Sequence, residues 1–347
     1  MKDFGFQNIN KMNFEDQYQF KNTELIFTLF KSGDLREDSG FYFSVGNFKA
    51  LLTVDANNLN FLKLPKVDLF ASSFAGGAHG YPLNCENYEL KDRIKMIQID
   101  KNFIKKTKFK YIEQIRPTYF LPYAGFFKEK LKRDDVYIKY NKKNNTKDYK
   151  KICEKYNVKL LNPEKENIFN FFRDKSFKSS AHKGKYYKDL SSKKYLNYFL
   201  KKYQKIDLEY IKDYFLNCNF HDKSKLYISL TNDNFEVKDT NFKIEFSEKI
   251  KFFVIRQDLS NYLDNDDNYL HLKIRKESFL NTIYNKRSWE DISIGFQNRQ
   301  YRKPNIYNSN FWFHFSNVYV SKKFVKSYTD CSNCLSLTQD IQNVMFK

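Results

Sequence analysis

The stretch from Trp289 to Phe315 gathers side chains that suit a phosphorylated ligand. It holds two nearby arginines, Arg299 and Arg302, and a guanidinium presents paired N–H donors that match the oxygens of a phosphate. Neighbouring side chains offer an amide, a phenol, a stacking surface and an imidazole: Gln297, Tyr307, Trp312 and His314. We expect these residues to bind substrate, with an ordinary surface ion pair for each arginine as the alternative.

Histidine and cysteine, the usual protein ligands of zinc and of iron–sulfur clusters, are scattered along the chain. The five histidines occur singly and are more typical of packed or surface residues than of metal ligands: His79, His182, His221, His271 and His314. The five cysteines are an odd number at irregular spacings, so we expect reduced thiols rather than a disulfide framework. Cys331 and Cys334 have the spacing of half a zinc site, but no second pair accompanies them.

Apolar runs in the first half of the chain predict a sheet that positions possible site residues. The expected elements are strands at 25–30, 41–45, 48–54, 67–71 and 119–121, a hairpin turn at 46–47 and a helix at 90–114. Sites in α/β folds usually lie at the sheet edge where strands end. Asp55 follows one strand. Gly76 and Gly77 follow another, where they permit a close backbone approach to a ligand or a tight turn.

The second half of the chain predicts a separate domain. Apolar spacing indicates helices at 195–203, 208–215 and 277–284, and alternating runs indicate an antiparallel sheet of strands at 226–230, 242–246, 252–255 and 270–274. The Lys- and Asn-rich residues 139–159 are expected to be a solvated helix or an insertion. We therefore predict a mobile lead-in at 1–23, a first domain at 24–178, a smaller domain at 189–325 and a tail at 326–347.

The charge of the chain is strongly positive, with 61 Lys and Arg against 41 Asp and Glu. A field of this sign attracts anionic partners. The accompanying excess of Lys, Asn, Tyr, Phe and Ile is also what AT-rich coding DNA would give, so both explanations of the charge stand. No apolar run approaches the ~18 residues that span a bilayer, and no signal peptide is evident. We expect a cytoplasmic protein without a membrane partner.

Three segments resemble a known family. They are residues 52–82, which include Phe74-Ala75-Gly76-Gly77-Ala78-His79-Gly80-Tyr81-Pro82, residues 115–127, which include Leu121-Pro122-Tyr123-Ala124-Gly125, and residues 289–315, which include Ile294-Gly295-Phe296-Gln297-Asn298-Arg299-Gln300. In order and approximate spacing they resemble the C-terminal half of CMP-N-acetylneuraminate hydroxylase and of the related bacterial UDP-N-acetylmuramate hydroxylase. The resemblance covers roughly residues 25 to 320.

The resemblance implies a fold and an activity. The fold is of the α/β class, a partial metallo-β-lactamase-like αββα sandwich followed by a smaller α+β C-terminal domain. The activity is oxygenation: a Rieske iron–sulfur domain and the metallo-β-lactamase-like domain together hydroxylate the N-acetyl group of a nucleotide-activated amino sugar to N-glycolyl. The resemblance also implies substrate-binding residues in the two earlier segments: Gly76, Gly77, His79 and Tyr123.

The sequence departs from this family in its metal ligands. A Rieske cluster is held by Cys-x-His and Cys-x-x-His pairs, and metallo-β-lactamase metals by His-x-His-x-Asp-His; neither pattern occurs. Asp55 is left as an incomplete metal site, so iron or zinc is expected only if a partner supplies the missing ligands. We expect a split or truncated form that needs a Rieske or metal-binding partner subunit and is inactive alone. A degenerate pseudoenzyme is the other explanation.

Two further function classes remain as alternatives. A metal-dependent hydrolase follows from the metallo-β-lactamase resemblance, but hydrolysis needs a metal-bound water, for which the ligands are missing. A basic anion-binding or nucleic-acid-binding protein follows from the charge together with 26 Tyr and 36 Phe. No nucleic-acid-binding motif occurs, so nucleic acid is the less favoured partner.

Overall fold

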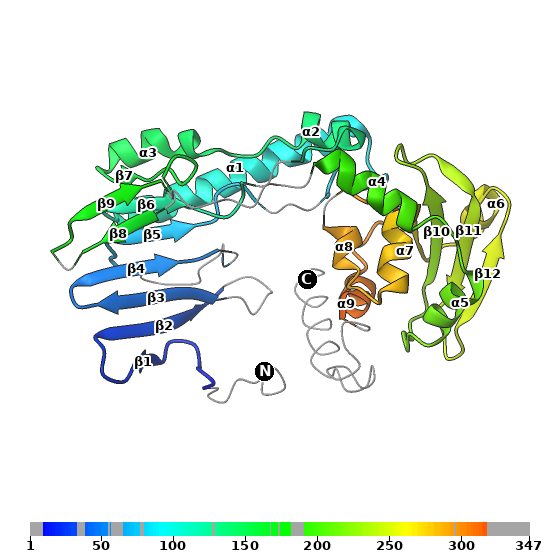
Figure 1. Cartoon of the computed structure of the whole chain (residues 1–347), viewed down its shortest axis with the longest axis horizontal. Coiled ribbons are helices and arrows are strands. Elements are labelled where there is room, and N and C mark those ends of the chain that lie inside the picture. Colours follow the sequence, from blue (N-terminus) through cyan, green and yellow to red (C-terminus); the bar gives the residue numbers. More distant parts are fainter. Residues whose placement is uncertain are drawn as a thin grey trace. The chain divides into compact units, whose positions relative to one another are not determined.

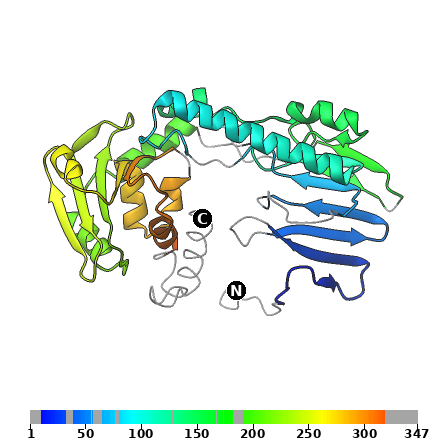
Figure 2. The same ribbon diagram turned by 180° about the vertical axis from the view of Figure 1, so that it is seen from behind.

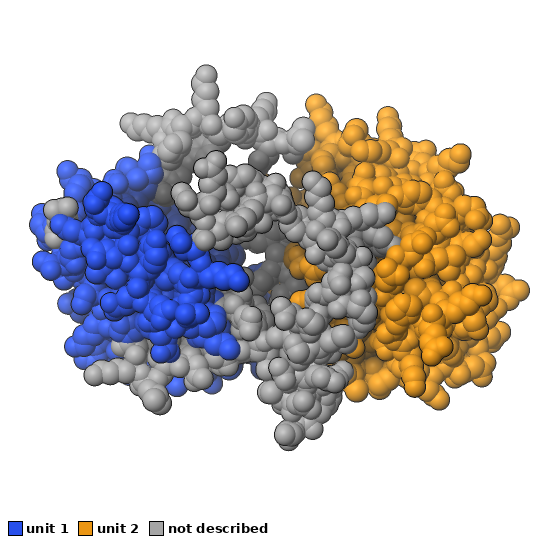
Figure 3. Space-filling view, turned by 90° about the horizontal axis from the view of Figure 1, so that it is seen from below, with its two compact units in different colours: residues 1–77, 98–127, 142–187 blue, residues 78–97, 128–141, 188–347 orange. Residues whose placement is uncertain are grey.

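The chain forms two compact units that interleave along the sequence (Figure 3). The computed structural model describes residues 10–32, 39–54, 56, 65–76, 80–126, 129–166, 168–172, 174–181, 191–294 and 296–317. Unit 1 is residues 1–77, 98–127 and 142–187, and unit 2 is residues 78–97, 128–141 and 188–347. The domain boundaries predicted from the sequence stay predictions.

Unit 1 is built on a seven-stranded mixed sheet (Figure 1). Its strands, in chain order and in sheet order, are β1 (Gln17–Gln19), β2 (Leu25–Lys31), β3 (Ser39–Val45), β4 (Phe48–Leu52), β5 (Leu69–Ser72), β6 (Tyr119–Pro122) and β7 (Lys159–Leu160). The strands from β1 to β4 pair antiparallel, and those from β4 to β7 pair parallel. Gly46 adopts φ +55° in the turn between β3 and β4, as the predicted hairpin requires.

Helices cover one face of this sheet and a hairpin covers the other. Successive strand residues point to opposite faces, so neighbouring residues of one strand pack against different layers. The C-terminal part of α1 (Leu90–Ile115) lies over one face of the sheet (Figure 2). Buried residues of α1 and of α3 (Lys150–Lys155) form one cluster there with Phe70 and Phe120. The neighbouring residues Leu69 and Tyr119 face the hairpin of β8 (Ile168–Phe171) and β9 (Phe177–Ser180). The 3-10 helix η3 (Thr146–Tyr149) precedes α3.

Unit 2 is built on a five-stranded sheet in the order β12-β11-β10-β13-β14. Its strands are β10 (Lys225–Thr231), β11 (Val237–Glu245), β12 (Lys251–Ile255), β13 (Tyr269–Arg275) and β14 (Asn298–Lys303). Neighbouring strands pair antiparallel except β10 and β13, which are parallel. The predicted antiparallel sheet is therefore wrong at this pair. The chain crosses back through α6 (Ser260–Asp264), so β13 runs in the direction of β10.

The core of unit 2 lies on one face of its sheet. Four helices supply the covering layer: α5 (Leu208–Leu216), α7 (Lys276–Tyr284), α8 (Glu290–Ser293) and α9 (Ser309–Asn317). Trp289 is fully buried among them, and its indole N–H donates to Tyr214 Oη at 2.8 Å. The remaining helices of this unit are η2 (Lys132–Asp134), α2 (Asp135–Tyr140) and α4 (Ser192–Lys202).

The predicted mixed α/β class is confirmed, with two main sheets. The expectation that residues 139–159 stay outside the core is wrong, because η3 and α3 bury Tyr149 and Cys153 in unit 1. Within the described ranges, the structure contains no helix with the length and apolar character of a membrane span.

Candidate functional site

Residues 80–88 join unit 2 by pairing with strand β14. The Glu86 amide donates to the Gln300 carbonyl at 2.7 Å, and the Gln300 amide donates to the Asn84 carbonyl at 2.7 Å. The Asn87 side chain donates to the Arg302 carbonyl at 2.7 Å and accepts from the Arg302 amide at 3.0 Å. The end of the first sequence motif and the third motif are thereby neighbours within this unit.

A pocket of about 550 Å³ lies between this segment, β14 and the N-terminal part of α9. We call it the Arg302 pocket. Three of the residues predicted to bind substrate line it: Arg302, Tyr307 and Trp312. Its wall also includes Tyr81, Asn84 and Gln300. Sequence reasoning did not select these last three, although Tyr81 and Gln300 fall within the motifs.

The polar groups of the Arg302 pocket are buried and incompletely paired. Arg302 is only 6% exposed, and its Nε donates to Asn305 Oδ1 at 3.1 Å. Its guanidinium forms no ion pair with any carboxylate in the described part of the chain. The buried oxygens Asn84 Oδ1 and Gln300 Oε1 have no hydrogen-bond partner among the described residues. A buried polar group without a partner is costly, so these atoms mark places where a ligand can bond.

The chemistry of this pocket suits a ligand with an anionic part and a planar or ring part. The Arg302 guanidinium provides donors for phosphate oxygens, while Tyr307 and Trp312 provide aromatic surface. The two amide oxygens accept hydrogen bonds from N–H or O–H groups of a base or sugar. Tyr307 is 55% exposed, which places it at the mouth of the pocket rather than at its floor.

Arg299 and Gln297 lie outside this pocket and are held within unit 2. The Arg299 guanidinium carbon lies 3.9 Å from the Phe235 ring centroid and 3.6 Å from that of Phe296. Burial, followed by the nearby charge of Arg275, lowers the pKa of Arg299 to about 9. Gln297 Oε1 accepts from the guanidinium groups of Arg133 at 3.2 Å and Arg275 at 3.3 Å.

His314 also lies outside the pocket, on the core side of α9. Its Nε2 is 2.8 Å from the Cys218 carbonyl oxygen, and its ring centroid is 5.0 Å from that of Phe220. Burial is the main cause that lowers the pKa of His314 to about 4, so its imidazole is neutral at pH 7. Trp312 and His314 are two residues apart, which turns their side chains toward different sides of the helix.

The other predicted site residues belong to unit 1 or lie outside the described residues. Gly76 has φ +78°, and a Cβ there would lie 3.0 Å from Ile104 Cδ1, so the tight turn itself requires glycine. Tyr123 Oη accepts from the Val54 amide at 3.2 Å, which joins the segments that follow β6 and β4. Outside the described residues are Asp55, Gly77, His79, Cys331 and Cys334.

The described residues do not fit a Rieske cluster or a metallo-β-lactamase metal site. No three His, Cys, Asp or Glu side chains among them are grouped to hold a metal ion. Cys85, Cys153 and Cys218 are separately buried, and burial raises the pKa of all three thiols, to about 12 for Cys153 and Cys218. None of these three cysteines belongs to a group of described side chains that could hold a metal ion.

Comparison with known proteins gives one consistent relationship. The chain is 25% identical over 280 residues to "Cytidine monophosphate-N-acetylneuraminic acid hydroxylase" of Asterias rubens, a match that covers 76% of this chain and 42% of that protein. The hydroxylase of the same name from Xenopus laevis is 27% identical, and the match covers 77% of this chain and 47% of that protein. The chain is a distant relative of these hydroxylases.

The Gorilla gorilla gorilla hydroxylase is 26% identical over 327 residues, covering 89% of this chain and 53% of the relative. The chain thus spans about half the length of the curated hydroxylases that it matches. No protein-family model matches it. The relationship therefore includes most of this chain but only part of each hydroxylase.

Proposed function

We propose that this chain is the substrate-holding part of a nucleotide-sugar N-acetyl hydroxylase, and that the Arg302 pocket binds the nucleotide part of the substrate. The observation that carries the proposal is a buried guanidinium without a described carboxylate partner, in a pocket with aromatic and amide side chains. The distant similarity to cytidine monophosphate-N-acetylneuraminic acid hydroxylases supports a nucleotide-activated amino sugar as the ligand.

The proposal has a second part that concerns unit 1 and the reacting groups. We propose that unit 1 is part of a metallo-β-lactamase-like sandwich and that a partner supplies the Rieske cluster and the oxygen-activating metal. The mixed sheet with helices on one face is compatible with such a layer. The purified chain with a reductant should form no N-glycolyl product. Product formed by the chain alone would overturn this second part without affecting the first.

Isothermal titration calorimetry with CMP-N-acetylneuraminate tests the binding part. Replacing Arg302 by methionine keeps a long side chain but removes the donors to phosphate, so affinity should fall about tenfold to a hundredfold, as for the loss of charged hydrogen bonds. CMP alone should show the same loss, and free N-acetylneuraminate should bind poorly to both proteins.

The matched control is Arg256→Met, which removes an exposed arginine that does not line the Arg302 pocket. Its affinity for the nucleotide sugar should equal that of the wild type. Equal affinities of Arg302→Met and wild type would remove the pocket assignment, and equal losses in the two variants would show that only the net positive charge matters.

A further inference from the structure

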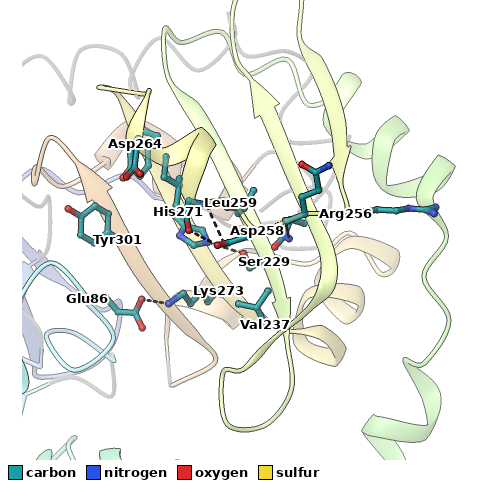
Figure 4. Close-up of a pocket in the computed structure, with 15 residues that line it drawn as sticks. Glu86, Ser229, Val237, Arg256, Asp258, Leu259, Asp264, His271, Lys273 and Tyr301 are labelled. Atoms are coloured by element: carbon teal, nitrogen blue, oxygen red, sulfur yellow. Dashed lines mark hydrogen bonds and ion pairs between the residues drawn. The ribbon is translucent and has the colours of Figure 1, made fainter.

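A second pocket lies on the face of the unit 2 sheet opposite α5, α7, α8 and α9, and α6 forms part of its wall. It has a volume of about 680 Å³, which is within the usual range for small-molecule sites. We call it the His271 pocket (Figure 4). Side chains alternate along a strand, so Gln300 and Arg302 line the Arg302 pocket while Tyr301, between them, lines this one. The two pockets are separate sites on opposite faces of β14.

The floor of the His271 pocket is made of neutral polar side chains on adjacent strands. Ser229 Oγ lies 2.9 Å from His271 Nε2, and Figure 4 shows these two side chains facing each other. Asn241, only 3% exposed, donates from Nδ2 to the Gln257 carbonyl at 3.1 Å. Its Oδ1 is buried and has no hydrogen-bond partner among the described residues. This amide oxygen is an acceptor that the protein does not satisfy, which is expected where a ligand donates.

The imidazole on this floor is uncharged at neutral pH. Burial, followed by the charge of Lys273, lowers the pKa of His271 to about 4. A neutral imidazole has one N–H donor and one acceptor nitrogen, so it contributes both kinds of hydrogen bond. The floor therefore offers Ser229, His271 and Asn241 as mixed donors and acceptors without a net charge.

The charged residues of the rim do not favour a free anion. Lys273 Nζ and a Glu86 carboxylate oxygen are 2.8 Å apart, so these charges neutralise each other. Arg256 extends away from the other labelled residues in Figure 4. Asp258 and Asp264 form no ion pair with a lysine or arginine among the described residues. The rim is thus slightly acidic, in contrast to the positive net charge of the whole chain.

Three classes of small ligand are distinguished by this lining. A phosphate presents mainly acceptor oxygens and negative charge, so it matches Asn241 Oδ1 poorly and is repelled by the two aspartates. An alkylammonium has only donors, so it cannot accept a hydrogen bond from the O–H and N–H groups of the floor. A hydroxyl both donates and accepts, which matches the mixed floor, and the face of Tyr301 can contact the C–H groups of a ring. The requirements of the lining therefore converge on a neutral ligand with several hydroxyl groups.

We propose that the His271 pocket binds a neutral sugar, with Asn241 Oδ1 and the Ser229–His271 pair bonding its hydroxyls and Tyr301 covering its ring. The sugar is either a free monosaccharide or a terminal residue of a glycan, since both present the same hydroxyls. This site is distinct from the Arg302 pocket and takes a different class of ligand. Its existence does not depend on nucleotide binding.

Saturation-transfer difference NMR on the full chain tests the proposal, with glucose, galactose, mannose and N-acetylglucosamine as probes. At least one of them should receive saturation from the protein, and Asn241→Leu should abolish this transfer because it removes the unpaired acceptor. Asn261→Leu is the matched control, since Asn261 is exposed on α6 and does not line the pocket. Its signal should equal that of wild type.

Tyr301→Ala keeps the proposal testable if Asn241→Leu does not fold, because Tyr301 is 37% exposed and lies on the rim. Its saturation transfer should fall severalfold. An equal signal from the methyl glycoside identifies a glycan terminus as the ligand, and loss of signal on methylation identifies a free sugar. Absence of transfer to all four sugars, or transfer that persists unchanged in the folded pocket variants, overturns the proposal. The proposal is also overturned if inorganic phosphate or putrescine, and none of the sugars, changes the NMR chemical shifts of residues that line the pocket.

Discussion

Basic side chains on the two faces of the unit 2 sheet have different partners. On the face opposite α5, α7, α8 and α9, Arg275 Nη1 lies 2.7 Å from a carboxylate oxygen of Asp134, and Lys273 pairs with Glu86 at 2.8 Å. On the helix side, Arg302 is nearly buried but has only the neutral Asn305 as a side-chain hydrogen-bond partner among the described residues. The guanidinium groups of Arg275 and Arg302 thus have different electrostatic surroundings within one sheet.

This difference separates structural cations from the cation available to a ligand. Moving an ion from water into the protein interior is unfavourable in free energy, and a carboxylate next to it offsets part of this penalty. For Arg275 and Lys273, a carboxylate of the protein provides this offset. Arg302 has no such carboxylate among the described residues, so an anionic ligand would supply the counter-charge.

The largest effect is expected from Asp134→Ala. Asp134 and Arg275 are both fully buried, and the substitution leaves the guanidinium charge without its carboxylate. The free energy of unfolding of unit 2 should fall by about 3 to 5 kcal/mol, the usual cost of breaking a buried pair. Urea unfolding followed by Trp289 fluorescence measures this, because Trp289 lies in the unit 2 core.

The control for this change is Asp291→Ala on α8. Asp291 forms an exposed i,i+4 pair with Arg287 at 3.2 Å, which should contribute at most about 0.5 kcal/mol. Similar losses of stability in the two variants would contradict the distinction between buried and exposed pairs.

The next effect is a loss of stability in mild acid. The pKa of both His271 and His314 is lowered to about 4 by burial, below the unfolded value of about 6.5. Between these values the unfolded chain binds more protons, so stability is full above pH 6.5 and falls as the pH drops toward 4. Each histidine contributes a change on the order of 3 kcal/mol. The urea concentration at the unfolding midpoint should fall less steeply with decreasing pH in His271→Gln than in the wild type. An equally steep fall in the two proteins would contradict the neutral imidazole.

Arg299 and Arg302 should respond in opposite ways to replacement by methionine. Arg299 is stacked between Phe235 and Phe296, so Arg299→Met should lower the stability of unit 2 by about 1 to 2 kcal/mol and leave nucleotide affinity unchanged. Arg302→Met should reduce affinity with little loss of stability. Calorimetry and urea unfolding on both variants form the test. A fall in nucleotide affinity for Arg299→Met would return Arg299 to the binding site that its sequence motif suggested.

Local structure was well predicted from the sequence because local patterns determine it. The Gly46-Asn47 turn lies between two alternating strands, and a long apolar period marks α1, so both elements are found close to their predicted bounds. Tyr149 and Cys153 were missed because abundant lysines around them hide a short buried face. Period and composition describe a segment but not what packs against it.

The candidate site could be predicted only in part, for a related reason. The third motif indicated Arg302, Tyr307 and Trp312 by their chemistry. Asn84 was missed because its place in the pocket depends on residues 80–88 pairing with β14, and the Asn84–Asn298 side-chain bond joins positions 214 apart in the sequence. No local pattern carries that pairing. Arg299 and Arg302 are three residues apart on β14, so their side chains point to opposite faces of the sheet. This strand was not predicted from the sequence, so the two arginines could not be separated.

The smallest effect on stability is expected at the pair beside the His271 pocket. Lys273 and Glu86 are each about 30% exposed, so Lys273→Met should change the free energy of unfolding by at most about 1 kcal/mol. The same substitution removes a positive charge that helps to lower the pKa of His271. The imidazole pKa, followed by NMR titration, should therefore rise from about 4 toward its ordinary value while remaining depressed by burial. A loss of stability comparable to that of Asp134→Ala would contradict the weak contribution of this exposed pair, and an unchanged imidazole pKa would show that the Lys273 charge does not act on His271.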